Sequence, residues 1–156
     1  MKKIYLLVAT GVFMLSCGNK TEKKDGFQMN RSKQEVVAQE KEGVPVDMSN
    51  KGIGPVKSVE LGAIDQDLAD TGRDLFDGMC MACHMIETKM IGPALKGVTD
   101  RRSPEWIMNF IINPTEMLKK DPIAIALLKE SNNAQMTDLG MNEEDARAIL
   151  EYLRSL

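Results

Sequence analysis

The sequence is poor in several residue types from which metal sites and protein cores are built. Its 156 residues include one histidine and three cysteines, and three of these four residues fall in a single pentapeptide. A structural zinc site needs four nitrogen or sulfur ligands. Because Cys17 is assigned another role below, only the three residues of the pentapeptide remain, which are too few for such a site. Aromatic residues make up only 4% of the sequence, which leaves little bulky apolar material for a core. No alternation of apolar and polar residues predicts a β-strand.

The longest mainly apolar run is short and stands at the N-terminus. It extends over twelve residues, from Ile4 to Leu15, whereas a membrane-spanning helix needs about 20. Two lysines precede the run and Ser16-Cys17 follows it, which predicts a cleaved signal peptide over residues 1–16. The segment resembles a bacterial lipoprotein signal, in which the cysteine after the cleavage site is acylated; an ordinary secretory signal is the alternative. Several acyl chains on Cys17, at about 0.8 kcal/mol per buried CH₂, would anchor the protein to a membrane.

Residues 17–62 are polar and follow neither a helical nor a strand period. Between Cys17 and Gly62 there are eight basic and seven acidic residues. Such a composition buries too little apolar surface to offset the entropy of ordering, so it predicts a flexible tether. A coil of this length spans roughly 35–40 Å on average, enough to let a domain swing away from a bilayer. A short folded subdomain around residues 43–54 is the alternative, because this stretch contains Gly and Pro.

Residues 63–156 form the predicted domain, and their patterns are helical throughout. Apolar residues recur at helical spacing. Ser103 and Asn142 are expected to cap two of the helices, Asp121-Pro122 opens another, and Asp65 and Asp67 lie near the start of the first. The expected helices run over residues 65–79, 103–113, 121–129 and 142–153. The predicted fold class is therefore all-α, in one small domain.

The most specific pattern in the chain is Cys80-Met81-Ala82-Cys83-His84. Cys-x-x-Cys-His is the spacing that attaches a c-type haem, because two thiols on one turn add to the haem vinyl groups while the next imidazole faces the iron. A Cys80–Cys83 disulfide would not explain why a histidine follows the second cysteine. A thioredoxin-like redox pair would need a βαβ context, which the sequence does not predict. The motif occurs once, which predicts a single haem.

A haem would also supply the apolar bulk that the sequence lacks. A domain of about 94 residues buries only about 60–65% of its unfolded surface, which is marginal without help. Folding and haem attachment are therefore expected to be coupled. Chain made without haem should be largely unstructured between Ala63 and Leu156.

Residues 67–156 resemble a class I, mitochondrial-like cytochrome c domain. Gly72 and Phe76 stand where this family packs its first helix against its last. Residues 91–97, Ile-Gly-Pro-Ala-Leu-Lys-Gly, resemble the family's Gly-Pro-x-Leu-x-Gly loop. The resemblance implies an all-α domain wrapped around one covalent haem.

The resemblance also implies roles for residues beyond the motif. The carbonyl of Pro93 would accept a hydrogen bond from the imidazole that ligates the iron, which fixes the ring. Trp106, with either Arg101 or Arg102, would reach the haem propionates. The two arginines are adjacent in the sequence, so the sequence does not distinguish them.

A methionine is the second axial ligand that the resemblance implies. The family's ligand stands in a loop a few residues before the last helix, which predicts Met136, with Met141 as the alternative. Thr137 follows Met136 at a position where the family most often has proline, so this loop is less constrained. Met79, Met81 and Met85 lie too close to His84 in sequence to reach the opposite face of the haem. Met108 is on an expected helix, where methionine usually fills core space.

These observations predict an electron carrier with one haem c, held by Cys80 and Cys83 and ligated by His84 and Met136. With both axial positions filled, oxygen and peroxide have no site on the iron, so the protein is not expected to be an enzyme. The alternative is a haem-based enzyme, or a gas or redox sensor, whose sixth ligand is displaced.

The charge of the domain and the N-terminal segment predict where such a carrier works. Residues 63–156 carry a net charge of −6, which favours redox partners with basic docking surfaces. The expected partners are a quinol-oxidising complex, a terminal oxidase or a periplasmic reductase, and no nucleic acid is expected to bind. The expected location is the periplasmic side of a bacterial membrane, held there by the lipid on Cys17.

Overall fold

The computed structural model describes residues 43–156, which contain five α-helices and one 3₁₀ turn. Within this range no β-strand forms, and the predicted all-α class is confirmed. None of these helices is long and apolar enough to cross a membrane. The predicted signal peptide, Cys17 and the first part of the predicted tether lie outside the described residues. The elements are α1 (Gln66–Met79), η1 (Val98–Asp100), α2 (Pro104–Ile112), α3 (Pro114–Lys120), α4 (Pro122–Glu130) and α5 (Glu143–Arg154).

The four predicted helices begin at side chains that cap them. Asp65 accepts a hydrogen bond from the N–H of Leu68 at 3.1 Å and so satisfies a free donor at the start of α1. Ser103, Asp121 and Asn142 make the same kind of contact at the starts of α2, α4 and α5. Helix α3 is absent from the sequence-based expectation, because its seven residues are too few to show a period.

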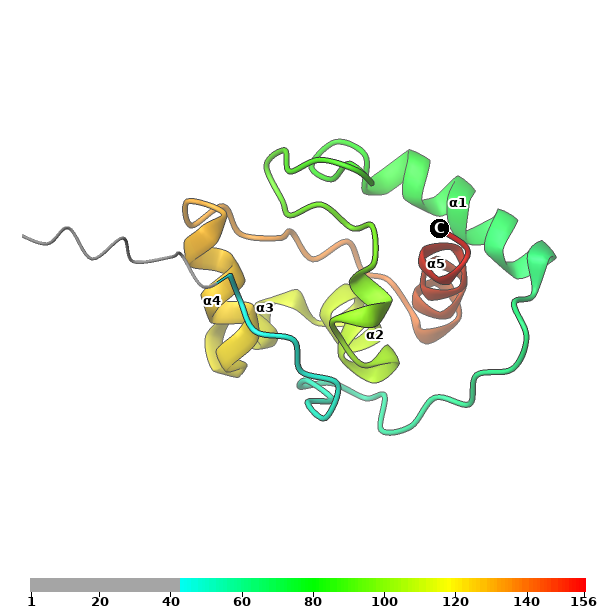
Figure 1. Ribbon diagram of the computed structural model, residues 1–156, viewed down its shortest axis with the longest axis horizontal. Helices are drawn as coiled ribbons and strands as arrows, with labels where there is room; N and C mark the ends of the chain where they lie inside the picture. The colour runs from blue at the N-terminus through cyan, green and yellow to red at the C-terminus, as the bar shows by residue number, and fades with distance from the viewer. Residues whose placement is uncertain (1–42) are drawn as a thin grey trace, which may run out of the picture. The chain divides into compact units, whose positions relative to one another are not determined.

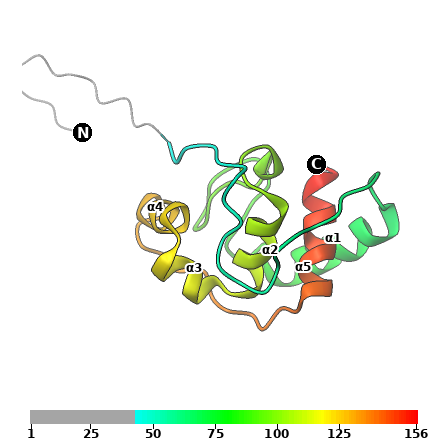
Figure 2. The same ribbon diagram turned by 90° about the horizontal axis from the view of Figure 1, so that it is seen from below.

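Gly72 allows the backbone of α1 to touch that of α5 where the two helices cross (Figures 1 and 2). A Cβ atom on Gly72 would lie 1.9 Å from the carbonyl oxygen of Ala148, which is far inside van der Waals contact. One turn further along α1, the ring of Phe76 packs against that of Tyr152, with centroids 5.5 Å apart. The first helix therefore packs on the last, as the resemblance implies.

Replacing Gly72 with alanine is expected to destabilise the folded protein by about 1–3 kcal/mol, because the atoms that the new methyl group meets are backbone atoms and the helices must separate. Thermal unfolding of the haem-loaded protein measures the change. Gly78→Ala is the matched control on the same helix, since a Cβ there meets nothing within 4 Å. Alanine at that position should raise stability by about 0.5–1 kcal/mol. A Gly72→Ala protein as stable as wild type would contradict the close backbone contact.

Residues 43–62 belong to the same compact unit as the helices, so the folded unit begins before residue 63, the boundary that composition predicts. We call residues 44–62 the strap, which Figure 1 shows in cyan to green, passing α2 on its way to α1. The side chain of Asn109 on α2 is 1% exposed and bonds to the strap backbone. It donates to the carbonyls of Lys51 and Val56, at 2.8 and 2.9 Å, and accepts from the N–H of Val56 at 3.0 Å.

The strap is ordered by these contacts with distant side chains, and this explains why its sequence reads as a flexible coil. The backbone N–H and C=O groups of the strap bond to side chains, both on α2 and α5 and within the strap. They therefore need no helix or strand to satisfy them, and the sequence shows no helix or strand period. At its far end the carbonyl of Gly62 accepts a hydrogen bond from Arg154 at 2.8 Å. A Cβ on Gly54 would lie 2.2 Å from the side-chain oxygen of Asn109, so the strap passes α2 in close contact.

Glu151 on α5 is a fully buried carboxylate that fastens the start of α1. It accepts hydrogen bonds from Arg147, Arg154 and the N–H of Asp65. Burial raises the pKa of the Glu151 carboxyl, but the hydrogen bonds from Arg147 and Asp65 outweigh it and hold the pKa below its ordinary value of 4.5. The stability that this carboxylate contributes is therefore present above pH 4.5 and is lost as the pH falls through the lower folded pKa.

Candidate haem site

The Cys80–His84 motif forms a tight turn at the end of α1. The N–H of Cys80 bonds to the carbonyl of Phe76 at 2.8 Å, and the N–H groups of Cys83 and His84 both bond to the carbonyl of Cys80, at 3.0 and 2.9 Å. The two sulfurs are not joined in a disulfide. Burial, together with the neighbouring Cys83, raises the pKa of the Cys80 thiol. Both cysteines are therefore free to form other covalent bonds from one turn.

The imidazole of His84 is held by the loop that follows the motif. Its Nδ1 lies 3.0 Å from the carbonyl oxygen of Pro93. A carbonyl can only accept, so Nδ1 carries the proton and Nε2 keeps the lone pair that a metal ligand needs. The N–H of Gly92 bonds to the carbonyl of Cys83 at 2.8 Å, which fixes the loop beside the motif. The hydrogen bond that the resemblance implies for Pro93 is thus present.

Gly92 leaves room for the His84 ring, since a Cβ at this position would lie 2.3 Å from ring atom Cε1. Gly92→Ala is expected to turn the ring away from Pro93 and to weaken its bond to a metal by roughly 10–100-fold, the usual effect of losing such a supporting contact. The absorption spectrum of the haem-loaded variant should show iron that has partly lost an axial ligand.

Gly62→Ala is the control for this variant, because a Cβ at Gly62 meets nothing within 4 Å. Its spectrum should equal that of wild type. An unchanged spectrum in Gly92→Ala would show that the close approach of this glycine does not determine how His84 is held.

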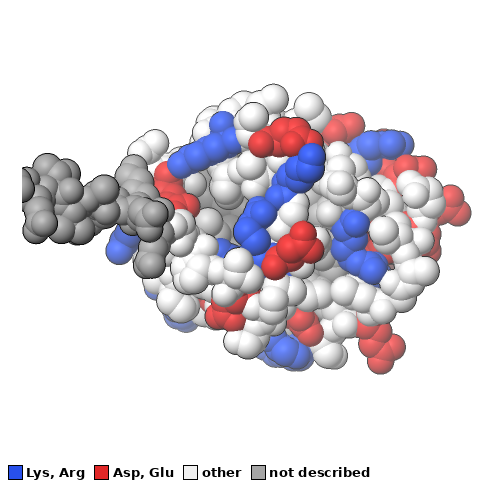
Figure 3. Space-filling model, viewed as in Figure 1, with Lys and Arg blue, Asp and Glu red and all other residues white. Residues whose placement is uncertain are grey.

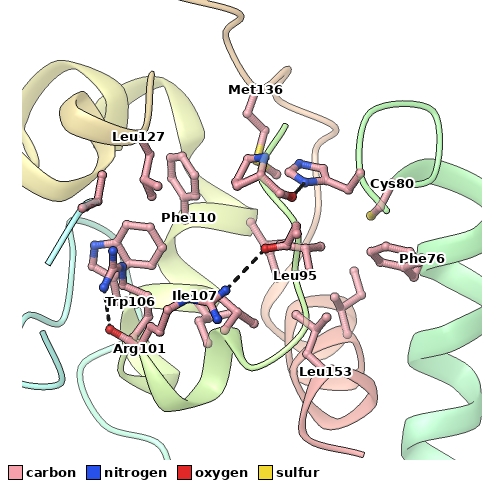
Figure 4. A pocket seen from close by; sticks show the side chains of 18 of the residues that line it. Phe76, Cys80, Leu95, Arg101, Trp106, Ile107, Phe110, Leu127, Met136 and Leu153 are labelled. Carbon is pink, nitrogen blue, oxygen red and sulfur yellow. Dashed lines mark hydrogen bonds between the residues drawn. The ribbon is translucent and has the colours of Figure 1, made fainter. Parts of the chain in front are cut away.

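Two adjoining cavities open beside the motif, with empty volumes of about 1010 and 1000 Å³, open solvent at their mouths included. Figure 4 shows apolar side chains from α1, α2, α4 and α5 around this space, among them Phe76, Ile107, Leu127 and Leu153. An apolar lining with a few polar groups is typical of a cofactor site. Six residues line both cavities: Cys80, His84, Pro93, Phe110, Leu127 and Met136.

Met136 and Met141 occupy different environments. Met136 is half-buried on the wall of both cavities, and its side chain points from its loop toward them (Figure 4). Met141 lines neither cavity and is 7% exposed within the hydrophobic core. The geometry therefore favours Met136 over Met141 as the methionine available to a ligand in the cavity.

Arg101 and Arg102 both line the first cavity but make different contacts. Arg101 donates to the carbonyls of Lys96 and Ala94, at 2.8 and 3.4 Å. Arg102 is 3% exposed, and its Nη1 donates to the carbonyl of Pro45 at 2.7 Å. Within residues 43–156 neither guanidinium is paired with a carboxylate. Two positive charges at the cavity wall therefore remain available to an anion.

Trp106 presents its ring to the cavity, and its N–H group is used elsewhere. The indole N–H donates to the carboxylate of Asp121 at 3.1 Å, and the ring packs against Phe110 with centroids 5.0 Å apart. The guanidinium of Arg102 lies 5.6 Å from the centre of the Trp106 ring. The Trp106 ring thus contacts the guanidinium of Arg102. Its N–H is already bonded to Asp121 and is not available to a propionate.

Many cavity residues are absent from the sequence-based site, and Phe110, Leu127 and Val44 are three examples. Phe110 lies one turn after Trp106 on α2, so helical spacing alone would have placed it on the same wall. Leu127 on α4 and Val44 on the strap carry no such signal. They reach the cavity through tertiary packing that no local pattern reports.

Comparison with known proteins identifies the family to which this geometry belongs. The family Cytochrome c matches residues 69–156, more than half of the chain, and the protein belongs to the cytochrome c family. Members of this family bind haem c covalently through cysteines, and Cys80 and Cys83 stand in the required C-x-x-C-H spacing. No curated protein matches the chain.

Solved structures agree with this assignment. A cytochrome c from Rhodothermus marinus is 50% identical, with a TM-score of 0.64, and the match covers 65% of this chain and 88% of that one. An engineered form of the Rhodothermus marinus protein, bound to a carbene intermediate, is 48% identical over 65% of this chain and 88% of that one, with a TM-score of 0.60. The cytochrome c domain of a Pseudomonas putida protein is 30% identical over 54% and 85% of the two chains, with a TM-score of 0.50.

Proposed function

We propose that the protein is an electron carrier with one haem c, bound through Cys80 and Cys83 and ligated by His84 and Met136. The observation that carries this proposal is the donor set around one apolar space: two free cysteines on one turn, an imidazole with an available Nε2, and a methionine on the cavity wall. These residues fit the chemistry of haem c, which supplies one-electron transfer at its iron when bound.

Each residue of the site has a definite task in such a carrier. Pro93 orients the His84 ring and makes it a better donor to the metal. The thioether of Met136 is a soft ligand that favours the ferrous state and raises the reduction potential. The apolar lining excludes water, while Arg101 and Arg102 supply positive charge for the haem propionates.

The net charge of the domain favours electrostatic steering of the protein toward its redox partner. Figure 3 shows acidic and basic side chains interspersed on one face. Residues 63–156 nevertheless carry a net charge of −6. A partner with a basic docking surface is favoured, through an association rate that falls as salt is added. A quinol-oxidising complex, a terminal oxidase or a periplasmic reductase has the required chemistry, with the carrier held at a periplasmic membrane surface by lipid on Cys17.

A second candidate is a haem enzyme or sensor in which the sixth ligand leaves the iron. The engineered Rhodothermus marinus relative favours it, because that relative is bound to a carbene intermediate, which is chemistry beyond electron transfer. In the present chain the residues on both sides of Met136 are exposed and form no helix or strand, so little holds the loop in place.

Carbon monoxide distinguishes the two candidates. The reduced protein of a carrier with His and Met ligands should show sharp c-type bands that do not change when carbon monoxide is added. The oxidised protein should show the weak far-red band of a methionine bound to ferric iron. A wild-type spectrum that shifts on addition of carbon monoxide would favour the enzyme or sensor.

A further inference from the structure

We propose that the strap is a positioning element of the haem site: through Pro45 and Asp47 it holds Arg102 so that the unused N–H groups of the guanidinium face a carboxylate of the haem. This inference rests on the proposed function, since it requires a haem in the cavity. It assigns a task to a segment whose composition alone predicts a flexible tether.

The first residues of the strap run directly beside Arg101 and Arg102. The N–H of Asp47 donates to the carbonyl of Arg101 at 3.1 Å, and Asp47 and Arg102 form an isolated parallel bridge. The carbonyl of Pro45 accepts from Nη1 of Arg102 at 2.7 Å. Val44 is itself part of the cavity wall, and its N–H donates to the carboxylate of Glu130 at 3.2 Å. The strap therefore reaches the cavity at the place where the arginines stand.

The guanidinium of Arg102 keeps donors that the protein does not use. Only Nη1 has hydrogen-bond partners within residues 43–156, although a guanidinium offers five N–H groups. No fully buried side-chain nitrogen or oxygen in the same part of the chain lacks a partner, so Nε and Nη2 must open onto space. Arg102 is 3% exposed and lines the cavity, so the cavity is the space within reach of these N–H groups.

Three carboxylates lie near Arg102, but none of them forms an ion pair with its guanidinium within residues 43–156. Burial and the adjacent Arg101 lower the pKa of Arg102, whereas Asp47 on the strap, Asp121 at the start of α4 and Glu130 at its end raise it. A carboxylate that enters the cavity would therefore meet a desolvated cation, which binds anions more strongly than a hydrated one.

The carboxylate of Asp47 is hydrogen-bonded within the strap and forms no ion pair with Arg102. Its Oδ1 accepts hydrogen bonds from the N–H and hydroxyl of Ser49, at 2.8 and 2.7 Å, and from the N–H of Asn50 at 3.1 Å. These bonds hold the pKa of Asp47 below its ordinary value of 3.8, so the carboxylate is ionised and can accept them at neutral pH. The turn sets the course of the backbone that carries the Pro45 carbonyl.

An arginine held against a carboxylate lowers the pKa of that carboxylate by about 1–3 units. The strap should therefore keep the haem carboxylate ionised at neutral pH. The reduction potential of the iron depends on pH only where a nearby group titrates, so the potential of wild type should be nearly constant around neutral pH. Loss of the strap contact or of the guanidinium should raise the pKa of the haem carboxylate. The reduction potential would then change with pH over a higher pH range.

The test is the reduction potential of the full-length, haem-loaded protein, measured as a function of pH. Arg102→Gln is expected to raise the apparent pKa in this profile by about 1–3 units, or 10- to 1000-fold in proton affinity. Ser49→Ala should shift it in the same direction by a smaller amount, because the turn loses the hydrogen bond from the Ser49 hydroxyl while the guanidinium and the charge of Asp47 remain. Met48→Ala is the matched control, since this neighbouring side chain is 48% exposed, and its profile should equal that of wild type.

Pro45→Gly provides a second way to loosen the strap if Ser49→Ala leaves the turn in place. It keeps the accepting carbonyl but frees the backbone, and the expected shift is again upward. A shift in Arg102→Gln with none in either strap variant would overturn the role of the strap. A larger shift in Arg101→Gln than in Arg102→Gln would overturn the assignment of the arginine.

The outcome also separates this inference from the proposed function. Wild-type protein without bound haem would refute the proposed function itself. A normal c-type spectrum in every variant, together with identical pH profiles, would refute only the positioning role of the strap.

Discussion

Replacing Met136 with alanine is expected to abolish the weak far-red band of the oxidised protein and to let carbon monoxide bind the reduced protein. Met136 is on the wall of both cavities, and in the proposed carrier its thioether closes the sixth position of the iron. Its loss removes the soft ligand that stabilises ferrous iron, so the reduction potential should also fall. Absorption spectroscopy and a redox titration measure the three effects on one sample.

Met141→Ala is the matched control, and its expected effect lies in stability. Met141 is 7% exposed in the core, so its truncation should destabilise the protein by about 2–5 kcal/mol. The far-red band should remain. Loss of the band in Met141→Ala, with the band intact in Met136→Ala, would reverse the assignment of the ligand.

Protein made without haem is expected to show no cooperative thermal unfolding. The residues that would surround the haem come from α1, α2, α4 and α5, and many of them are apolar. An unfilled apolar cavity costs roughly 2.4 kcal/mol for every 100 Å³. The whole free energy of unfolding of a domain is only about 5–15 kcal/mol. A core built around a haem therefore has too little stability of its own to remain packed without one.

Circular dichroism during heating tests this expectation on the double variant Cys80→Ser, Cys83→Ser, which cannot form the thioether bonds. The haem-loaded wild-type protein is the control and should unfold in one sharp transition. Residual helix in the variant is compatible with the account, because α1 and α5 touch directly through Gly72. A sharp transition in the haem-free variant, at a temperature near that of wild type, would contradict the coupling of folding to the cofactor.

Features set by nearby residues could be predicted from the sequence. Each predicted helix starts at a cap whose hydrogen bond spans three residues, so Ser103 and Asn142 mark helix starts without any knowledge of the fold. The Cys80–His84 motif is equally local. Pro93 lies only nine residues from His84, and the resemblance to a known loop was enough to pair the two.

Features set by long-range contacts could not be predicted in the same way. Asn109 bonds to the strap across 53 residues of sequence, and nothing in the polar composition of the strap announces this partner. Arg101 and Arg102 are adjacent and chemically identical, and only the position of Pro45 distinguishes them. The sequence does not show that the indole N–H of Trp106 bonds to Asp121, and only the structure reveals that this N–H is not available to a propionate.

The central claim is that Cys80 and Cys83 carry a covalent haem, and peptide mass analysis tests it most directly. The protein should be produced with its own N-terminal segment in a host equipped for cytochrome maturation, then digested without reduction. The peptide containing both cysteines should be heavier by the mass of one haem, and every other peptide should be without haem. Recovery of this peptide at its unmodified mass, from a colourless protein, would contradict the account.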